Sequence, residues 1–163
     1  MMTLEPKAAA RATVPRLMIV RPPWEQKPGD DWREVHDTKA AAALFPDLGR
    51  TVFLAIGRKN LRPFFAAPGM RYLLRAVDAP VGLPPNFTLL TAKGPFAVAA
   101  ERDLMTAHEI EAIVAKNSGG DGAKIDAARE LALPVVMISR PPLPEGQWVP
   151  GVDEACDWTA ARL

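Results

Sequence analysis

Six short runs rich in Val, Ile and Leu recur along this chain, and several of them lack alternation between polar and apolar residues. Runs of this kind are typical of parallel strands that helices cover on both faces. They occupy residues 16–20, 51–56, 72–77, 87–90, 110–115 and 134–138.

Helical patterns lie between these runs. Residues 38–45 are alanine-rich, residues 98–108 place Leu104 and Met105 inward, and residues 123–133 carry small and apolar residues at helical spacing. The resulting order, largely β-α-β-α, predicts an α/β fold with a doubly wound, mainly parallel sheet and flanking helices. Ligands of such sheets bind beyond the carboxyl ends of the strands.

Composition narrows the class of protein. The 163 residues, 48% hydrophobic and 24% charged, suit one soluble domain or two halves of a slightly larger one. A single cysteine, Cys156, allows no internal disulfide, and no apolar run approaches 18 residues. We therefore expect a cytoplasmic protein without a membrane segment.

Charge is unevenly distributed although the net charge is only +1, which argues against a protein that mainly coats nucleic acid. No acidic residue lies between Leu48 and Val77, and this stretch holds six Lys and Arg residues. One region should therefore attract anions.

A glycine-rich turn at residues 116–122 joins a predicted strand to a predicted helix. Backbone N–H groups of such a turn can bind an anion, and Lys124 and Ser118 could add donors. The same pattern also fits a plain turn in which the glycines adopt positive φ and Asp121 caps the helix. The pattern alone leaves both readings open.

Sharper motifs are not matched. The chain has no G-x-G-x-x-G, and Ile125 follows Lys124 where a P-loop has Ser or Thr. His108-Glu109 has no second His four residues on, so we expect no metal site. Ser118 and Cys156 lack the sequence context of a nucleophile.

Cations also follow other predicted strands. Gly57-Arg58-Lys59, Lys93 and Arg140 each lie just past a strand, and a parallel sheet would bring all of them to the edge that holds Lys116 and Lys124. Together they would suit a multiply charged ligand. Taken singly, each also fits an ordinary exposed cation.

Read in order, six motifs resemble the precorrin-6A reductase family from about residue 7 to residue 157. They are RPPW at 21–24, VFLAIGR at 52–58, KGPF at 93–96, KNSGG at 116–120, AKIDAAR at 123–129 and VMISRP at 136–141. KNSGG followed by AK is the most distinctive element, and the set is specific where single motifs would be weak.

The resemblance implies a two-lobed, Rossmann-like reductase. With NADPH, it would reduce one double bond of precorrin-6A or cobalt-precorrin-6A to give precorrin-6B in cobalamin biosynthesis. The cofactor carries the hydride, so no nucleophilic triad is needed. No proton donor is assigned. The residues expected to bind cofactor or substrate are Lys116, Asn117, Ser118, Gly119, Gly120, Lys124, Gly57, Arg58 and Arg140.

The family begins with a strand and a glycine-rich nucleotide turn, which this sequence lacks. We therefore expect residues 1–20 to be the remnant of an N-terminal lobe, 21–50 a linker and first helix, and 51–163 the C-terminal lobe. The alternative function is a non-catalytic fragment or module that binds an anionic tetrapyrrole or nucleotide. No nucleic-acid or membrane partner is expected, and the oligomeric state is not predicted.

Overall fold

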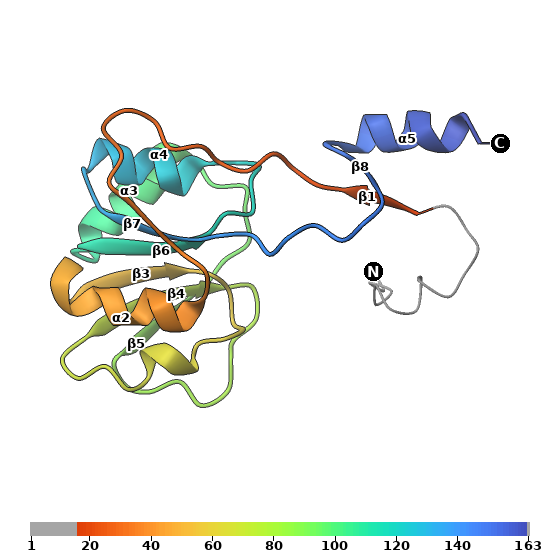
Figure 1. Ribbon diagram of the computed structural model, residues 1–163. Helices are drawn as coiled ribbons and strands as arrows, with labels where there is room; N and C mark the ends of the chain where they lie inside the picture. Colours follow the sequence, from red (N-terminus) through yellow and green to blue (C-terminus); the bar gives the residue numbers. More distant parts are fainter. Residues whose placement is uncertain (1–15, 163) are drawn as a thin grey trace. The chain divides into compact units, whose positions relative to one another are not determined.

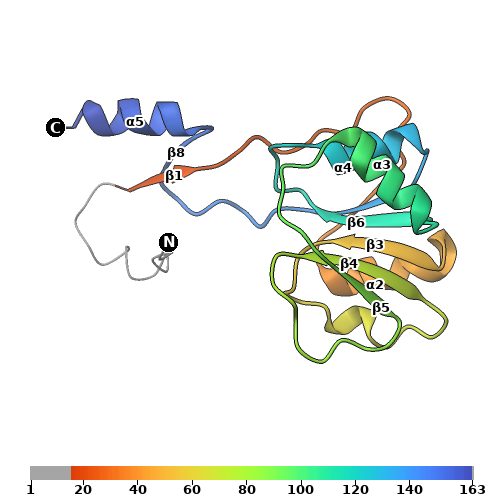
Figure 2. The ribbon, with the colours of Figure 1, turned by 180° about the vertical axis from the view of Figure 1, so that it is seen from behind.

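The computed structural model describes residues 16–162, shown in Figures 1 and 2. The chain divides into two compact units. Unit 1 comprises Met1–Pro22 and Pro142–Leu163, and unit 2 comprises Pro23–Pro141. Each is described by itself.

Unit 2 is built on a six-stranded sheet in which every neighbouring pair is parallel. The strand order is β2-β7-β6-β3-β4-β5. The strands are β2 (Trp32–Val35), β3 (Thr51–Ala55), β4 (Arg71–Ala76), β5 (Phe87–Thr91), β6 (Ala112–Lys116) and β7 (Val135–Ile138).

Helices cover both faces of this sheet. α2 (Thr38–Leu48) and the short 3-10 helix η1 (Arg62–Phe64) lie on one face, and α3 (Val98–Ala107) and α4 (Ala123–Glu130) lie on the other (Figures 1 and 2). The strands β3, β6 and β7 are therefore buried on both sides, which accounts for their continuous apolar sequences.

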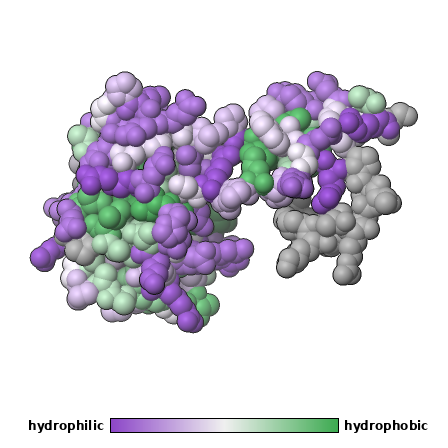
Figure 3. Space-filling view, in the orientation of Figure 1, coloured by the Kyte–Doolittle hydropathy of each residue, from purple (hydrophilic) through white to green (hydrophobic). Residues whose placement is uncertain are grey.

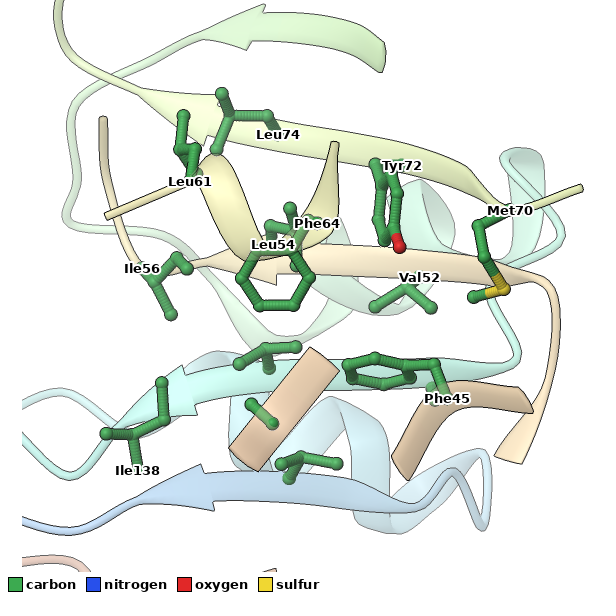
Figure 4. Close-up of a cluster of buried hydrophobic side chains, with 14 residues drawn as sticks. Phe45, Val52, Leu54, Ile56, Leu61, Phe64, Met70, Tyr72, Leu74 and Ile138 are labelled. Carbon is green, nitrogen blue, oxygen red and sulfur yellow. The ribbon is translucent and has the colours of Figure 1, made fainter. Parts of the chain in front are cut away.

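The β3 sequence shows how one strand serves two cores. Val52 and Leu54 pack with Phe45 of α2 and Phe64 of η1, as Figure 4 shows, whereas Phe53 faces the cluster under α3 and α4. Successive side chains of a strand point to opposite faces, so both must be apolar here. Each large side chain buried in this way contributes roughly 1.5–3 kcal/mol to folding.

The strand order has a reversal point. From β3 the chain moves outward through β4 to β5, then returns to place β6 on the other side of β3 and continues outward to β7. At such a point the loops that leave neighbouring strands diverge and open a crevice beyond their carboxyl ends. The ends of β3 and β6 are therefore the expected place for a ligand.

The Glu111 side chain caps two backbone N–H groups at the amino end of β3. Glu111 accepts hydrogen bonds from the backbone N–H groups of Arg50 and Thr51 at 2.7 and 2.8 Å. These two bonds, Arg50 first, lower the pKa of the Glu111 carboxyl. Gly49 precedes them with φ of +140°, and a Cβ there would lie 2.6 Å from the Glu111 Cβ. Only glycine fits this approach.

One ion pair is buried between the sheet and α3. Arg75 of β4 bonds to Glu101 of α3 through two hydrogen bonds, and their side chains are only 10% and 2% exposed. The Arg75 guanidinium also lies 3.9 Å from the centre of the Phe96 ring and 4.9 Å from that of Phe53. The positive charge is thus enclosed by one carboxylate and two aromatic faces.

Within its described residues, unit 1 contains a two-stranded parallel sheet of β1 (Leu17–Ile19) and β8 (Gln147–Val149), followed by α5 (Val152–Ala160). The indole N–H of Trp158 donates to Gln147, and Arg162 lies over the Trp158 ring.

On the face seen in Figure 3, hydrophilic residues cover the upper part of unit 2, with an apolar band below them. None of the helices in residues 16–162 is long and apolar enough to cross a membrane.

The predicted fold class is confirmed: a doubly wound parallel sheet with flanking helices. All six predicted strands and all three predicted helices are present. The strand predicted at residues 16–20, however, pairs with β8 and lies outside the main sheet. The elements β2, β8, α5 and η1 were not predicted.

The two units also differ from the expected division at residues 20 and 50. Of residues 21–50, expected as a linker and first helix, residues 23–50 belong to unit 2, where β2 joins the sheet and α2 covers one of its faces. Residues 142–163, expected in the C-terminal lobe, group with the N-terminal segment through the pairing of β1 with β8. Most of the expected N-terminal remnant, residues 1–15, lies outside the described residues.

Candidate functional site

A groove of about 480 Å³ lies at the carboxyl edge of the sheet in unit 2. The loops that follow β2, β6 and β7 form most of it, with Asn60 contributed by the loop after β3. It is lined by His36, Asp37, Thr38, Asn60, Lys116, Asn117, Ser118, Ile138, Ser139, Arg140 and Pro141. Its position, and the cations Lys116 and Arg140 among its lining residues, suit a ligand with anionic groups.

Two further hollows adjoin this groove by sharing lining residues with it. One, of about 460 Å³, shares Thr38 and Asn60 and contains Arg58 and Arg62. The other, of about 280 Å³, shares Lys116 and lies where β3 and β6 end, beside Gly57 and Arg58. The carboxyl edge is thus hollowed on both sides of the reversal point.

The structure brings several predicted site residues together here. Lys116, Asn117, Ser118 and Arg140 line the main groove, and Lys116 also borders the hollow with Gly57 and Arg58. Gly57 adopts φ of +74°, which permits the turn after β3. These residues come from three different strand ends, and only the parallel sheet joins them.

Arg58 and Arg140 differ in how they are held. Arg58 is about half exposed and forms an ion pair with Asp78 at 3.6 Å. Arg140 is partly buried and donates from Nε to the carbonyl oxygen of Asn117. Arg140 is therefore oriented by the loop after β6, whereas exposed pairs such as that of Arg58 are weak.

Asn117 is engaged with Trp24, a residue 93 positions away in sequence. The Asn117 Oδ1 atom accepts from the Trp24 backbone N–H at 2.8 Å, and Nδ2 donates to the Trp24 carbonyl at 3.0 Å. The Trp24 indole N–H donates to the Gly120 carbonyl at 3.0 Å. The Asn117 side chain thus anchors the Trp24 segment, in addition to lining the groove.

The rest of the glycine-rich turn lies beside the groove. Gly119 and Gly120 have positive φ, of 67° and 82°, and line none of the three hollows. Asp121 accepts a hydrogen bond from the backbone N–H of Ala123 at 3.0 Å, while Gly122 occupies the N-cap position of α4. Asp121 was expected to be the N-cap residue, but Gly122 holds that position, and Asp121 accepts only from Ala123, the first residue of α4.

Lys124 lies against Trp24 instead of lining the groove. Its ammonium nitrogen is 4.1 Å from the centre of the indole ring. Burial lowers the pKa of Lys124, and the nearby Arg75 guanidinium lowers it further. The ring face supplies part of the compensation that an ammonium at a helix N-terminus requires.

Lys93 was expected to converge with these cations. All the strands are parallel, so the loop after β5 does leave from the same edge, but Lys93 lines none of the three hollows. The convergence therefore involves the neighbouring ends of β3, β6 and β7.

Several lining residues were not predicted as part of a site. His36, Asp37 and Thr38 connect β2 to α2, and they could not be placed at a strand end because β2 was not predicted. Trp24 belongs to the RPPW motif but was not among the residues expected to bind cofactor or substrate. Among residues 16–162, no cluster of three or more His, Cys, Asp or Glu side chains could hold a metal ion.

Known proteins resemble this chain closely. Residues 3–160 match the family described as precorrin-6x reductase CbiJ/CobK. A precorrin-6A reductase of Rhodococcus erythropolis is 49% identical over 140 residues, covering 84% of this chain and 56% of the relative. The Rhodobacter capsulatus precorrin-6A reductase is 43% identical, covering 94% of this chain and 62% of the relative.

A solved structure agrees with these sequences. CobK precorrin-6A reductase superimposes with a TM-score of 0.88 at 40% identity, covering 95% of this chain and 65% of that one. This chain spans about three fifths of the length of the relatives it matches.

Proposed function

Because the chain belongs to the precorrin-6x reductase CbiJ/CobK family, we propose that it takes part in reducing one double bond of precorrin-6A or cobalt-precorrin-6A. The electron donor is NADPH and the product is precorrin-6B, within cobalamin biosynthesis. The observation that carries this proposal is the groove at the carboxyl edge of the sheet, lined by cations from separate strand ends.

The charges of this edge match the ligands. The corrinoid macrocycle bears several carboxylates and NADPH bears phosphates, so both ligands are polyanions. Lys116 and Arg140 line the main groove and Arg58 the adjoining hollow, where each can make a charge-assisted hydrogen bond. The hydroxyl of Ser118 adds a donor in the same groove.

NADPH supplies the hydride when it is bound. The residues of this chain fit anionic groups of the cofactor or the substrate at the reversal point, where Gly57 and Lys116 lie at the ends of β3 and β6. The chain has no G-x-G-x-x-G sequence, so that fingerprint does not hold the pyrophosphate here. The role proposed for these residues is to bind and orient.

The test is anaerobic NADPH oxidation with precorrin-6A, together with equilibrium binding of each ligand to the same chain. Lys116→Ala should weaken substrate or cofactor binding by about 1–3 kcal/mol, since a charge-assisted contact is lost. Lys93→Ala is the matched control, because Lys93 follows a strand at the same edge and lines none of the three hollows.

The outcomes separate the functions. Turnover that falls in Lys116→Ala and persists in Lys93→Ala supports the reductase. Binding without turnover supports the alternative, a module that binds an anionic tetrapyrrole or nucleotide. Equal loss in both variants would count against the groove as the site.

A further inference from the structure

Trp24 contacts the glycine-rich turn at three separate points. Its backbone pairs with the Asn117 side chain, its indole N–H donates to the Gly120 carbonyl, and its ring covers the Lys124 ammonium. The Trp24 backbone thus contacts the start of the turn, at Asn117. The Trp24 side chain contacts the middle of the turn, at Gly120, and the first turn of α4, at Lys124.

The turn needs such support from outside. Gly119, Gly120 and Gly122 occur within four residues, and glycine has more backbone freedom to lose on ordering than any other residue. Within the turn, the backbone N–H of Ser118 donates to the Lys116 carbonyl and that of Ala123 donates to the Asp121 side chain, so neither bond involves the Gly120 carbonyl. The indole N–H of Trp24 provides that carbonyl with a donor.

The same turn connects two parts of the candidate site. Lys116 and Ser118 line the groove at its beginning, and the Asn117 carbonyl accepts from Arg140, which lines the groove from β7. A shift of Asn117 would therefore move cations on two strand ends. A site that is ordered before binding loses less entropy when the ligand arrives.

We propose that Trp24 is a positioning residue of this site: by docking on Asn117, Gly120 and Lys124 it holds the glycine-rich turn in the conformation that binds an anionic tetrapyrrole. This inference rests on the proposed function, and it adds a residue that lines none of the three hollows.

The experiment compares the full chain with Trp24→Ala, Trp24→Phe and Asn117→Ala. Trp158→Ala is the matched control. The Trp158 indole N–H donates to the Gln147 side chain and Arg162 lies over its ring, but Trp158 lies in unit 1. Amide hydrogen exchange is measured at Ser118 and Ala123, and affinity is measured with uroporphyrin, an octacarboxylate tetrapyrrole, by its absorbance.

In Trp24→Ala we expect exchange at Ser118 and Ala123 to quicken about tenfold and uroporphyrin to bind about tenfold more weakly, since a hydrogen bond and a cation–π contact are lost. Trp24→Phe keeps the ring over Lys124 and should recover part of both effects. Asn117→Ala removes the two hydrogen bonds to the backbone of residue 24, which Trp24→Ala keeps, so the double variant should lose more than either single variant. Trp158→Ala should change neither measurement.

Unchanged exchange in both Trp24 variants would overturn the proposal, and so would faster exchange with unchanged uroporphyrin affinity. If the unmodified chain fails to bind uroporphyrin, the proposed function fails for this ligand and the binding role of Trp24 falls with it. The exchange data would then still show whether Trp24 holds the turn, so the two failures are distinguishable.

Discussion

Replacement of Glu101 by glutamine leaves the shape of a buried side chain and removes its charge. Arg75 is 10% exposed at its side chain and Glu101 2%, so water cannot replace the lost carboxylate. Removing one member of a buried pair costs about 3–5 kcal/mol, because the remaining charge stays desolvated. Glutamine can still accept one hydrogen bond from Arg75, which places the expected loss near the lower value, about 3 kcal/mol.

A second cation adds to this cost. The Lys124 ammonium is close enough to Arg75 for the guanidinium to lower the pKa of Lys124, and the Glu101 carboxylate acts in the opposite direction. Without that carboxylate, two partly buried positive charges face each other. The Glu101→Gln variant should therefore unfold at lower urea concentration, with a melting temperature roughly 6–12 °C lower for a chain of this size.

Urea unfolding followed by circular dichroism measures this loss. Glu130→Gln is the control, since the Arg102–Glu130 pair is about half exposed and should contribute less than about 1 kcal/mol. A double variant, Arg75→Met with Glu101→Leu, should lie closer to the unmodified chain than Glu101→Gln alone. A Glu101→Gln variant within about 1 kcal/mol of the unmodified chain would refute the reasoning.

Three further changes test other features. Lys124→Ala removes the cation that lies against the Trp24 ring, so it should weaken binding of the anionic ligand through the position of the turn, by about 1 kcal/mol, and an unchanged dissociation constant in calorimetry would remove Lys124 from the site. The folded-state pKa of Glu111 is depressed, so its stabilising effect should be present above about pH 4.5 and decline as pH falls through the lower folded value. Acid unfolding of Glu111→Gln should show a smaller decline, and equal curves would contradict this cap. Gly49→Ala should cost about 1–3 kcal/mol in urea unfolding, and more than Gly29→Ala, where positive φ is strained but space is open.

Apolar runs predicted most of the fold because a strand covered on both faces has no polar positions. β2 departs from this rule: its sequence Trp-Arg-Glu-Val has two exposed charged residues, as an edge strand that pairs only with β7 can have. β8 has only three residues, two of them exposed, and the sequence gives too short a pattern to recognise. Strands of both kinds depend on their partners more than on their own composition.

The candidate site was predictable to the extent that it follows buried strands. Lys116 and Arg140 could be placed at one edge because β6 and β7 were recognisable and parallel. The contacts of Trp24 with Asn117 and Lys124 could not be predicted, because they join positions 93 and 100 apart in the chain and no periodic pattern encodes such contacts. The role of a cation near a turn was therefore the least predictable part of the site.

The pairing of β2 with β7 has a consequence for the order of events during synthesis. It joins the first strand of unit 2 to the last, with Trp32 opposite Val135, about a hundred positions later. Closing so long a loop costs entropy that only contacts already made can offset, so we expect this pairing to form last. Until β7 has left the ribosome, β2 has no strand to pair with. The charges of Arg33 and Glu34 help to keep this segment solvated in the meantime.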